Sequence, residues 1–104
     1  MSGPVVVTAV FHPAPGARDA VLEVMHRALP LVHEEPGCEL YAIHDAPDGT
    51  IVMLEKWSSV EELDAHGVGQ PVEVLREGLK GLLSAPTEVV RLDPIPIGDA
   101  RGAL

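Results

Sequence analysis

The stretch Pro4–His12 (PVVVTAVFH) constrains the fold of this chain more than any other. β-branched and aromatic residues dominate it, which is typical of a strand. Both of its alternating sets are largely apolar; they are Val5, Val7, Ala9 and Phe11 on one face and Val6, Thr8 and Val10 on the other. A strand with one wet face alternates apolar with polar residues instead. We therefore expect both faces of this strand to be covered.

The hydrophobic period changes after the first strand and predicts a helix over residues 17–34. Pro30 lies on the polar side of this helix, where it deletes one backbone hydrogen bond, so we expect a kink there rather than an end. Glu35-Pro36-Gly37 opposes further helix and predicts the stop.

Two more helices are expected in the second half of the chain. Ser59 and Glu62 form a capping-box pattern that opens a short helix, which Gly67 closes. Pro71 suits the first position of another helix, which we expect to end at Ser84. A last strand follows over residues 87–92.

Residues 38–45 and 50–57 flank a turn-rich tetrapeptide and predict a hairpin. We expect residue 45 to pair with residue 50, because this register places Glu39 opposite Lys56 as an opposite-charge pair. The register puts side chains on two faces, with Glu55, Trp57 and His44 on one and Tyr41 on the other. Tyr41 and Glu55 are therefore not expected to share a cavity within one subunit.

The order of the elements, β-α-β-β-(α)-α-β, is typical of the ferredoxin-like split unit, an α+β fold with a four-stranded antiparallel sheet. A length of 104 residues fits one domain, which we place at residues 1–93, followed by an extended C-terminal tail at residues 94–104. Helices cover only one face of such a sheet. The second apolar face therefore predicts a homodimer that packs sheet against sheet as a dimeric α+β barrel.

The charge of the chain limits its partners. Sixteen acidic and seven basic residues give a net charge of -9, which repels nucleic acid and anionic membrane surfaces. No apolar run approaches the ~20 residues of a membrane span. The N-terminus lacks the pattern of a secretory signal, and the lone Cys38 can form no intramolecular disulfide. We expect a cytoplasmic protein with no nucleic-acid or membrane partner.

Four separated motifs, Pro15-Gly16, Glu35-Pro36-Gly37-Cys38-x-x-Tyr41, Glu55-x-Trp57-x-Ser59 and Ala65-His66, carry a resemblance to a known family. With them the sequence resembles the antibiotic biosynthesis monooxygenase superfamily of dimeric α+β barrels over Val5–Leu92. The resemblance implies a monomer pocket between sheet and helices, in which some members oxidise anthrones or quinols with dioxygen and without metal or flavin. It therefore implies no cofactor and a small aromatic or quinone-like substrate.

A second branch of this superfamily degrades haem, and the sequence departs from that branch. The members of that branch share an Asn on the first strand, a Trp at the end of the short helix and an iron-binding His on the next helix. Those places hold Val7 or Thr8, His66 and Leu75 here. Haem is therefore not the expected substrate.

Two titratable residues are the candidate catalytic groups. The imidazole of His66 has an ordinary pKa near neutrality, which suits a general base, although a helix C-terminus also favours a structural histidine. Glu55 interrupts an apolar strand, where an ionised carboxylate needs a partner such as His66 or a polar cavity. Trp57 is the candidate aromatic wall for a flat substrate, or else a core residue. Tyr41 and His44 are further candidate substrate-binding residues, although His44 lies near the hairpin tip, where exposure or a dimer interface also fits.

Three functions stay open from the sequence. The first is a cofactor-independent monooxygenase of a quinol, anthrone or similar phenolic compound; the second is a non-oxidative isomerase in the same pocket; the third is a non-catalytic ligand-binding module. A cavity lined by Glu55 and His66 would favour an enzyme, whereas mutual pairing of these groups away from any void would favour the module. The spacing of the histidines predicts no metal site.

Overall fold

The computed structural model describes residues 3–104 and places four strands and three α-helices in this range. One antiparallel sheet has the strand order β2-β3-β1-β4, with β1 at Val5–Phe11, β2 at Cys38–Asp45, β3 at Ile51–Trp57 and β4 at Glu88–Leu92. The helices are α1 (Arg18–His33), α2 (Val60–Gly67) and α3 (Gln70–Leu79). This order gives the ferredoxin-like α+β fold that the sequence predicts.

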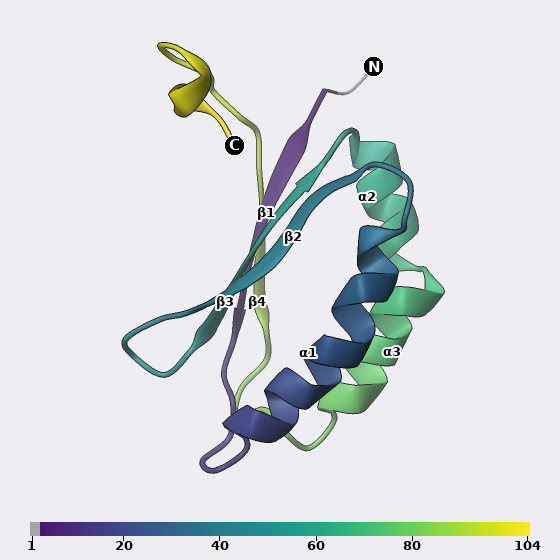
Figure 1. The fold of residues 1–104 in the computed structure, drawn as a ribbon, viewed down its shortest axis with the longest axis vertical. Coiled ribbons are helices and arrows are strands. Elements are labelled where there is room, and N and C mark those ends of the chain that lie inside the picture. Colours follow the sequence, from purple (N-terminus) through teal and green to yellow (C-terminus); the bar gives the residue numbers. More distant parts are fainter. Residues whose placement is uncertain (1–2) are drawn as a thin grey trace.

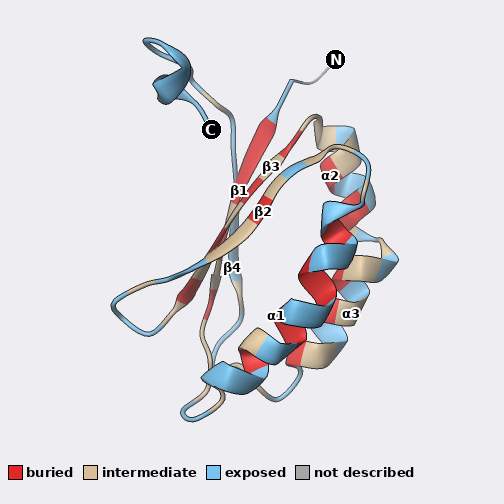
Figure 2. Ribbon diagram, in the orientation of Figure 1, coloured by how far each residue is buried: buried red, intermediate tan, exposed pale blue. Residues whose placement is uncertain are grey.

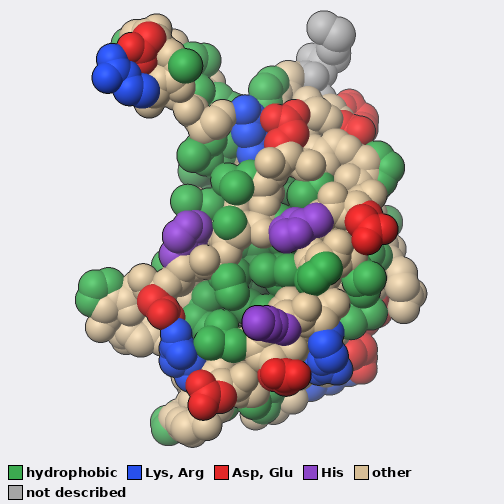
Figure 3. All heavy atoms as spheres, viewed as in Figure 1, with side chains coloured by type: hydrophobic (Ala, Val, Ile, Leu, Met, Phe, Trp, Pro, Cys, Tyr) green, Lys and Arg blue, Asp and Glu red, His purple; other side chains and the backbone are tan. Residues whose placement is uncertain are grey.

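All three helices lie on one face of the sheet, with α1 and α3 side by side (Figure 1). Buried residues concentrate where the two layers face each other (Figure 2). The strands contribute Val5, Val7, Ala9, Phe11, Ile51, Met53 and Trp57 to this core. On the side of the molecule seen in Figure 3, hydrophobic side chains fill the space between β2 and α1, and charged side chains lie around them.

The opposite face of the sheet, called the outer face below, has no covering layer in one chain (Figure 1). It presents Val6, Val10, Leu40, Val52, Leu54, Val90 and Leu92. Val90 is 50% exposed and Leu92 is 43% exposed. Helices cover only one face of β1 within the chain, although Val6 on the outer face is itself 9% exposed, and the expected cover over the rest of the outer face stays a prediction.

The β2-β3 hairpin has a different register from the predicted one over most of its length. Cys38 pairs with Trp57, as the predicted register requires, but Asp45 pairs with Ile51 instead of with the residue before it. The register shifts at an irregularity between Cys38 and Leu40, where β2 holds one extra residue. The predicted register is therefore wrong from Leu40 onward.

This shift moves two candidate site residues to the other face, because a slip of one residue exchanges the two faces of a strand. Tyr41 lies opposite Glu55 on the helix-bearing face, and His44 lies opposite a half-buried residue of the outer face. The predicted face assignments of Tyr41 and His44 are wrong. The predicted charge pair is present all the same, with the Lys56 ammonium 3.5 Å from the Glu39 carboxylate.

Helix α1 continues through Pro30, which is exposed, so the proline does not end it. Its buried residues are Val21, Val24, Met25, Ala28, Leu29 and Val32. Leu31 is 44% exposed, whereas Leu29 is 8% exposed. The helix is therefore turned so that its Leu29 flank faces the core. Gly37 then takes a φ of 81°, a conformation that favours glycine, and the chain enters β2.

Helix α3 ends at Leu79, earlier than predicted, because Gly81 with a φ of 80° turns the chain away. After β4 the tail leaves the sheet beside the N-terminal end of β1 (Figure 1) and is mostly exposed. It contains one 3-10 turn, Ala100–Gly102. The Lys56 ammonium donates to the backbone carbonyl oxygen of Leu104 at 2.5 Å.

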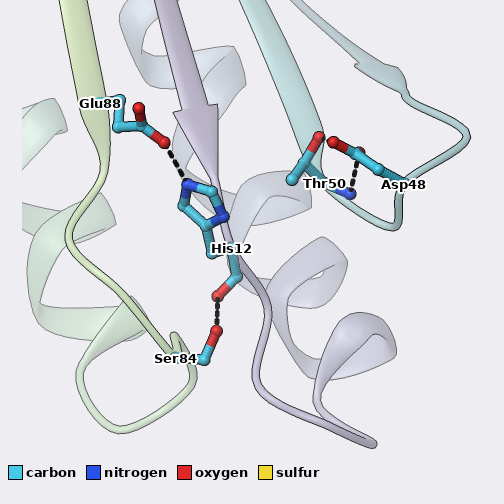
Figure 4. A network of polar contacts seen from close by, with 5 residues as sticks. All are labelled: His12, Asp48, Thr50, Ser84 and Glu88. Atoms are coloured by element: carbon cyan, nitrogen blue, oxygen red, sulfur yellow. Dashed lines mark hydrogen bonds and ion pairs between the residues drawn. The ribbon is translucent and has the colours of Figure 1, made fainter.

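Polar contacts tie the other end of the sheet together (Figure 4). The Nε2 atom of His12 lies 2.5 Å from a carboxylate oxygen of Glu88, the first residue of β4. The hydroxyl of Ser84 donates to the backbone carbonyl of His12 at 3.3 Å. In the neighbouring hairpin turn the carboxylate of Asp48 accepts from the amide and hydroxyl of Thr50. The contacts of His12 join the end of β1 to Ser84 and to the first residue of β4. None of the helices within residues 3–104 combines the length and hydropathy needed to cross a membrane.

Candidate active site

A cavity of about 550 Å³ lies between the sheet and helices α2 and α3. Its size falls in the range of small-molecule sites. Apolar side chains make most of its wall, namely Val7, Ala9, Phe11, Leu63, Val72, Leu75, Leu79, Leu83 and Val89. Glu55, His66 and Tyr41 supply polar groups within that wall. The cavity is therefore a mainly apolar chamber with a few polar side chains in its wall.

His66 is held at the C-terminal end of α2, where Ser59 caps the first turn by accepting from the Glu62 amide. The imidazole is 6% exposed, and its Nδ1 lies 2.7 Å from Oε1 of Glu35. An ionised carboxylate can only accept, so Nδ1 carries the proton in this pair. Nε2 is then the ring nitrogen that can exchange a proton with a bound molecule.

Glu35 is a residue that the sequence indicated as part of a helix stop and of a family motif, but not as a site residue. It follows the end of α1, and its carboxylate is 16% exposed. Gly69 makes room for it, because a Cβ atom at Gly69 would lie 2.9 Å from Oε2 of Glu35. The signal available in the sequence was the Glu35-Pro36-Gly37 motif itself, which places an acidic side chain where the chain turns toward β2.

Glu55 projects from the middle of β3 and is 5% exposed. Its Oε1 accepts a hydrogen bond from the indole Nε1 of Trp57 at 3.0 Å. Burial raises the pKa of the Glu55 carboxyl, while the Trp57 hydrogen bond and the charges of His66 and Arg91 act in the opposite direction. The sequence suggested a hydrogen bond between Glu55 and His66; in the structure Glu55 bonds to Trp57 and His66 bonds to Glu35.

An aromatic cluster surrounds the imidazole. The rings of Trp57 and His66 lie 4.6 Å apart, and Tyr41 meets His66 edge-on at 5.3 Å. Trp57 is fully buried and lies behind His66 rather than among the residues that line the cavity. Tyr41 does line the cavity together with Glu55, against the expectation from the sequence. Burial raises the pKa of the Tyr41 phenol far above its ordinary value, so the hydroxyl stays protonated and can donate.

His44, the remaining candidate, is exposed on the outer face and is absent from the residues that line the cavity. Its Nδ1 lies 3.3 Å from the backbone carbonyl oxygen of Val52. Among residues 3–104 no three His, Cys, Asp or Glu side chains gather as a potential metal site. The structure thus brings together four of the five predicted site residues, Tyr41, Glu55, Trp57 and His66, and leaves His44 apart.

Three cationic side chains that sequence reasoning also missed line the cavity, namely Arg76, Lys80 and Arg91. Nη2 of Arg76 donates to the backbone carbonyl of Gly67 at 3.1 Å. Nη2 of Arg91, on β4, donates to Asp64 at 2.7 Å. No sequence motif marks them, because α3 and β4 are brought to α2 only by the fold.

The chain is thus a small α+β protein of ferredoxin-like fold, with an apolar chamber between sheet and helices and a buried imidazole, paired with Glu35, in the chamber wall. A family model described as antibiotic biosynthesis monooxygenase matches residues 4–71, and the chain belongs to this family.

Individual relatives agree with this assignment. The chain is 31% identical to Rv0793 of Mycobacterium tuberculosis over 91% of its own length and 95% of that protein. The solved structure of Rv0793 superposes with a TM-score of 0.83 and covers 89% of this chain and 96% of that one. The protein named "Probable quinol monooxygenase YgiN" of Escherichia coli is 36% identical over 62% of this chain and 71% of its own length.

Proposed function

We propose that this protein is a cofactor-independent monooxygenase that oxidises a quinol, an anthrone or a similar phenolic compound with dioxygen. The family description and the name of the quinol monooxygenase relative support the general class. The observation that carries the proposal is the contact between Glu35 and His66, whose Oε1 and Nδ1 atoms lie 2.7 Å apart and whose buried imidazole lines an apolar cavity. A base held in this way suits the removal of a proton from a flat, weakly acidic substrate.

The chemistry starts when Nε2 of His66 takes a proton from the acidic carbon or hydroxyl of the substrate. Glu35 stabilises the imidazolium that forms, and the Tyr41 hydroxyl donates a hydrogen bond to the substrate oxygen. The apolar wall keeps water away from the anion. Trp57, whose indole donates to Glu55, packs against the His66 ring and fixes its position.

The electron-rich anion then passes one electron to dioxygen, and the resulting substrate radical and superoxide combine to form a C–O bond. The peroxide takes a proton from His66, and loss of water leaves a carbonyl group. For an anthrone methylene the balance is CH₂ + O₂ → C=O + H₂O, with one oxygen atom in the product and the other in water. The substrate supplies all of the electrons, so the proposal requires no cofactor.

A homodimer that packs the outer faces together is part of the proposal. The apolar side chains of this face, among them the half-exposed Val90 and Leu92, support it because a second copy would remove them from water. We also propose a cytoplasmic location, which fits a chain whose only cysteine, Cys38, is free.

Oxygen consumption tests the proposal, with a panel of hydroquinones and anthrones as substrates. His66→Gln is expected to lower kcat by about 100-fold or more, as loss of a general base does. Glu35→Gln keeps the side-chain shape and is expected to lower kcat by about tenfold, since the base loses its charged partner. His26→Gln, on the exposed side of α1, is the matched control.

Two outcomes would count against the proposal. Equal rates for wild type, His66→Gln and Glu35→Gln would remove the site assignment. Turnover that continues without oxygen would replace the monooxygenase by a non-oxidative isomerase that uses the same cavity. With ¹⁸O₂, one labelled atom is expected in the organic product and one in water.

A further inference from the structure

We propose that the cavity selects an anionic substrate, a phenolic ring system that carries a carboxylate held at the cavity mouth by Arg76 and Arg91. The ring system rests on the proposed function, and the carboxylate is the new element. Four independent features of the site point to it.

The first feature is where the charges lie. Of the seven Lys and Arg residues in the chain, three line the cavity, namely Arg76, Lys80 and Arg91. Of the sixteen Asp and Glu residues, Glu55 alone is among the residues that line it. A protein with a net charge of -9 has therefore concentrated positive charge at one place. Such a concentration attracts anions to the cavity against the overall charge.

The second feature is how the two guanidinium groups are held. Each is anchored on the C-terminal half of α2, Arg76 through the Gly67 carbonyl and Arg91 through Asp64. Each side chain is about half exposed, at 56% and 51%, so its group lies at the opening rather than in the core. A guanidinium has five N–H donors, and the bonds to Gly67 and Asp64 use few of them, so most remain for a ligand.

The third feature is the position of the acidic partners. Asp64 and Glu73, which pair with Arg91 and Arg76, do not line the cavity. They hold the two cations from the solvent side and leave the cavity side cationic. Burial also raises the pKa of the Glu55 carboxyl, which disfavours its charged form.

The fourth feature is the reach of the two charges into the cavity. The positive charge of Arg91 acts to lower the pKa of Glu55, and that of Arg76 acts to lower the pKa of Tyr41. Both residues line the same cavity as the arginines. A molecule that touches Tyr41 with its ring can therefore place a carboxylate within range of a guanidinium. Arginine recognises carboxylates with paired hydrogen bonds, which suits this group better than a hydroxyl.

Calorimetric binding of two oxidised probes tests the inference without any turnover. The probes are 1,4-naphthoquinone-2-carboxylate and its neutral carboxamide, which share ring and shape and differ in charge. Wild type is expected to bind the carboxylate at least about tenfold more tightly, as hydrogen bonds to charged groups allow. In the double variant Arg76→Gln/Arg91→Gln the carboxylate is expected to lose this advantage, while the affinity for the carboxamide stays unchanged.

Arg27→Gln, on the exposed side of α1, is the control and is expected to bind both probes as wild type does. Higher salt is expected to weaken binding of the carboxylate but not of the carboxamide. This salt test uses wild type alone and decides the question even if the double variant does not fold, which circular dichroism will show.

Equal affinity for the two probes in wild type would overturn the inference, and so would a carboxylate preference that survives in the folded double variant. These results differ from a failure of the proposed function. If the proposed function fails, the preference for the carboxylate probe remains, but no oxygen is consumed with any quinol or anthrone. Oxidation of neutral quinols without any charge preference would leave the proposed function in place and remove the carboxylate.

Discussion

At the residue scale, the centre of the site is an imidazole whose partner the sequence did not reveal. His66 could be chosen as a candidate from the sequence because an imidazole has an ordinary pKa near neutrality, which suits a general base. Its partner could not, because any of sixteen acidic residues was available and Glu35 lies 31 positions away. Only the packing of the turn after α1 against the end of α2 brings the two side chains together. Glu55 was found by a local rule, since a carboxylate in an apolar strand requires an explanation.

Glu55 makes the stability of the protein depend on pH. Burial raises the pKa of this carboxyl in the folded state above its ordinary value of 4.5, so the folded protein keeps a proton that the unfolded chain has lost. The free energy of unfolding therefore falls as pH rises through this range. Glu55→Gln removes the effect and can still accept from the Trp57 indole. We expect urea unfolding to show a larger gain, relative to wild type, at pH 8 than at pH 4.

Asp48→Asn provides the opposite case. The hydrogen bonds from Thr50 lower the pKa of Asp48, so its contribution to stability is present at pH 8 and is lost as pH falls through the folded-state pKa. This variant is expected to be destabilised relative to wild type at pH 8 more than in strong acid.

For Glu55→Gln, a difference in unfolding free energy from wild type that is the same at pH 4 and at pH 8 would contradict the expected rise of the Glu55 pKa.

Gly69 gives a way to disturb the acid–imidazole pair without altering either member. A methyl group there would meet the Glu35 carboxylate at 2.9 Å, and the Gly69 backbone is acceptable to alanine. Gly69→Ala is therefore expected to displace Glu35 and to lower kcat by about tenfold, the effect of losing an orienting partner. Steady-state oxygen uptake measures it. In a Glu35→Gln background the same substitution should add little, and full additivity would show that Gly69 acts elsewhere.

At the scale of the elements, the type and order of every helix and strand could be predicted, whereas the β2 register could not. Hydrophobic periodicity locates strands, but it does not reveal that one strand of a pair holds an extra residue. The Glu39–Lys56 charge pair fitted the predicted register and is present in the real one, so it could not distinguish them. An ion pair between two long side chains is compatible with more than one strand register, because the side chains can span the difference. The faces of Tyr41 and His44 followed from that one undetected residue.

Gly37 lies between α1 and β2 and next to the first turn of α2. A side chain at this position is expected to destabilise the protein. The Gly37 φ of 81° costs an alanine about 1–2 kcal/mol, and a Cβ atom would overlap the side chain of Glu62, a residue of the α2 cap. Gly37→Ala is therefore expected to destabilise the protein by roughly 2–4 kcal/mol, with the overlap adding to the backbone cost. Chemical denaturation measures the loss.

Gly16→Ala is the matched control for this substitution. Gly16 has a similar φ of 78°, but nothing lies within 4 Å of its missing Cβ. It is expected to show the backbone cost alone. Equal losses at the two glycines would mean that Glu62 moves aside without cost.

At the scale of the whole molecule, one face of the sheet is apolar and uncovered. Leu54 lies within this outer face on β3, opposite Thr8 of β1. Leu54→Lys is expected to weaken the proposed homodimer by about 100-fold or more, because an unpaired ammonium would be buried between two sheets. Light scattering after gel filtration measures the mass. Val68→Lys, at a side chain that is 89% exposed, is the control. A wild-type protein that is monomeric at every concentration would remove the dimer.

Strand β1 is shared between the chamber and the outer face, and this sharing has a thermodynamic consequence. Val7 lines the cavity, while Val6 on the same strand points to the outer face. A ligand that restrains β1 from one side alters its freedom on the other. Reciprocity then requires that whatever factor the ligand exerts on self-association, self-association exerts on ligand affinity. Ligand binding measured at micromolar and at nanomolar protein concentration would in that case give two different binding constants.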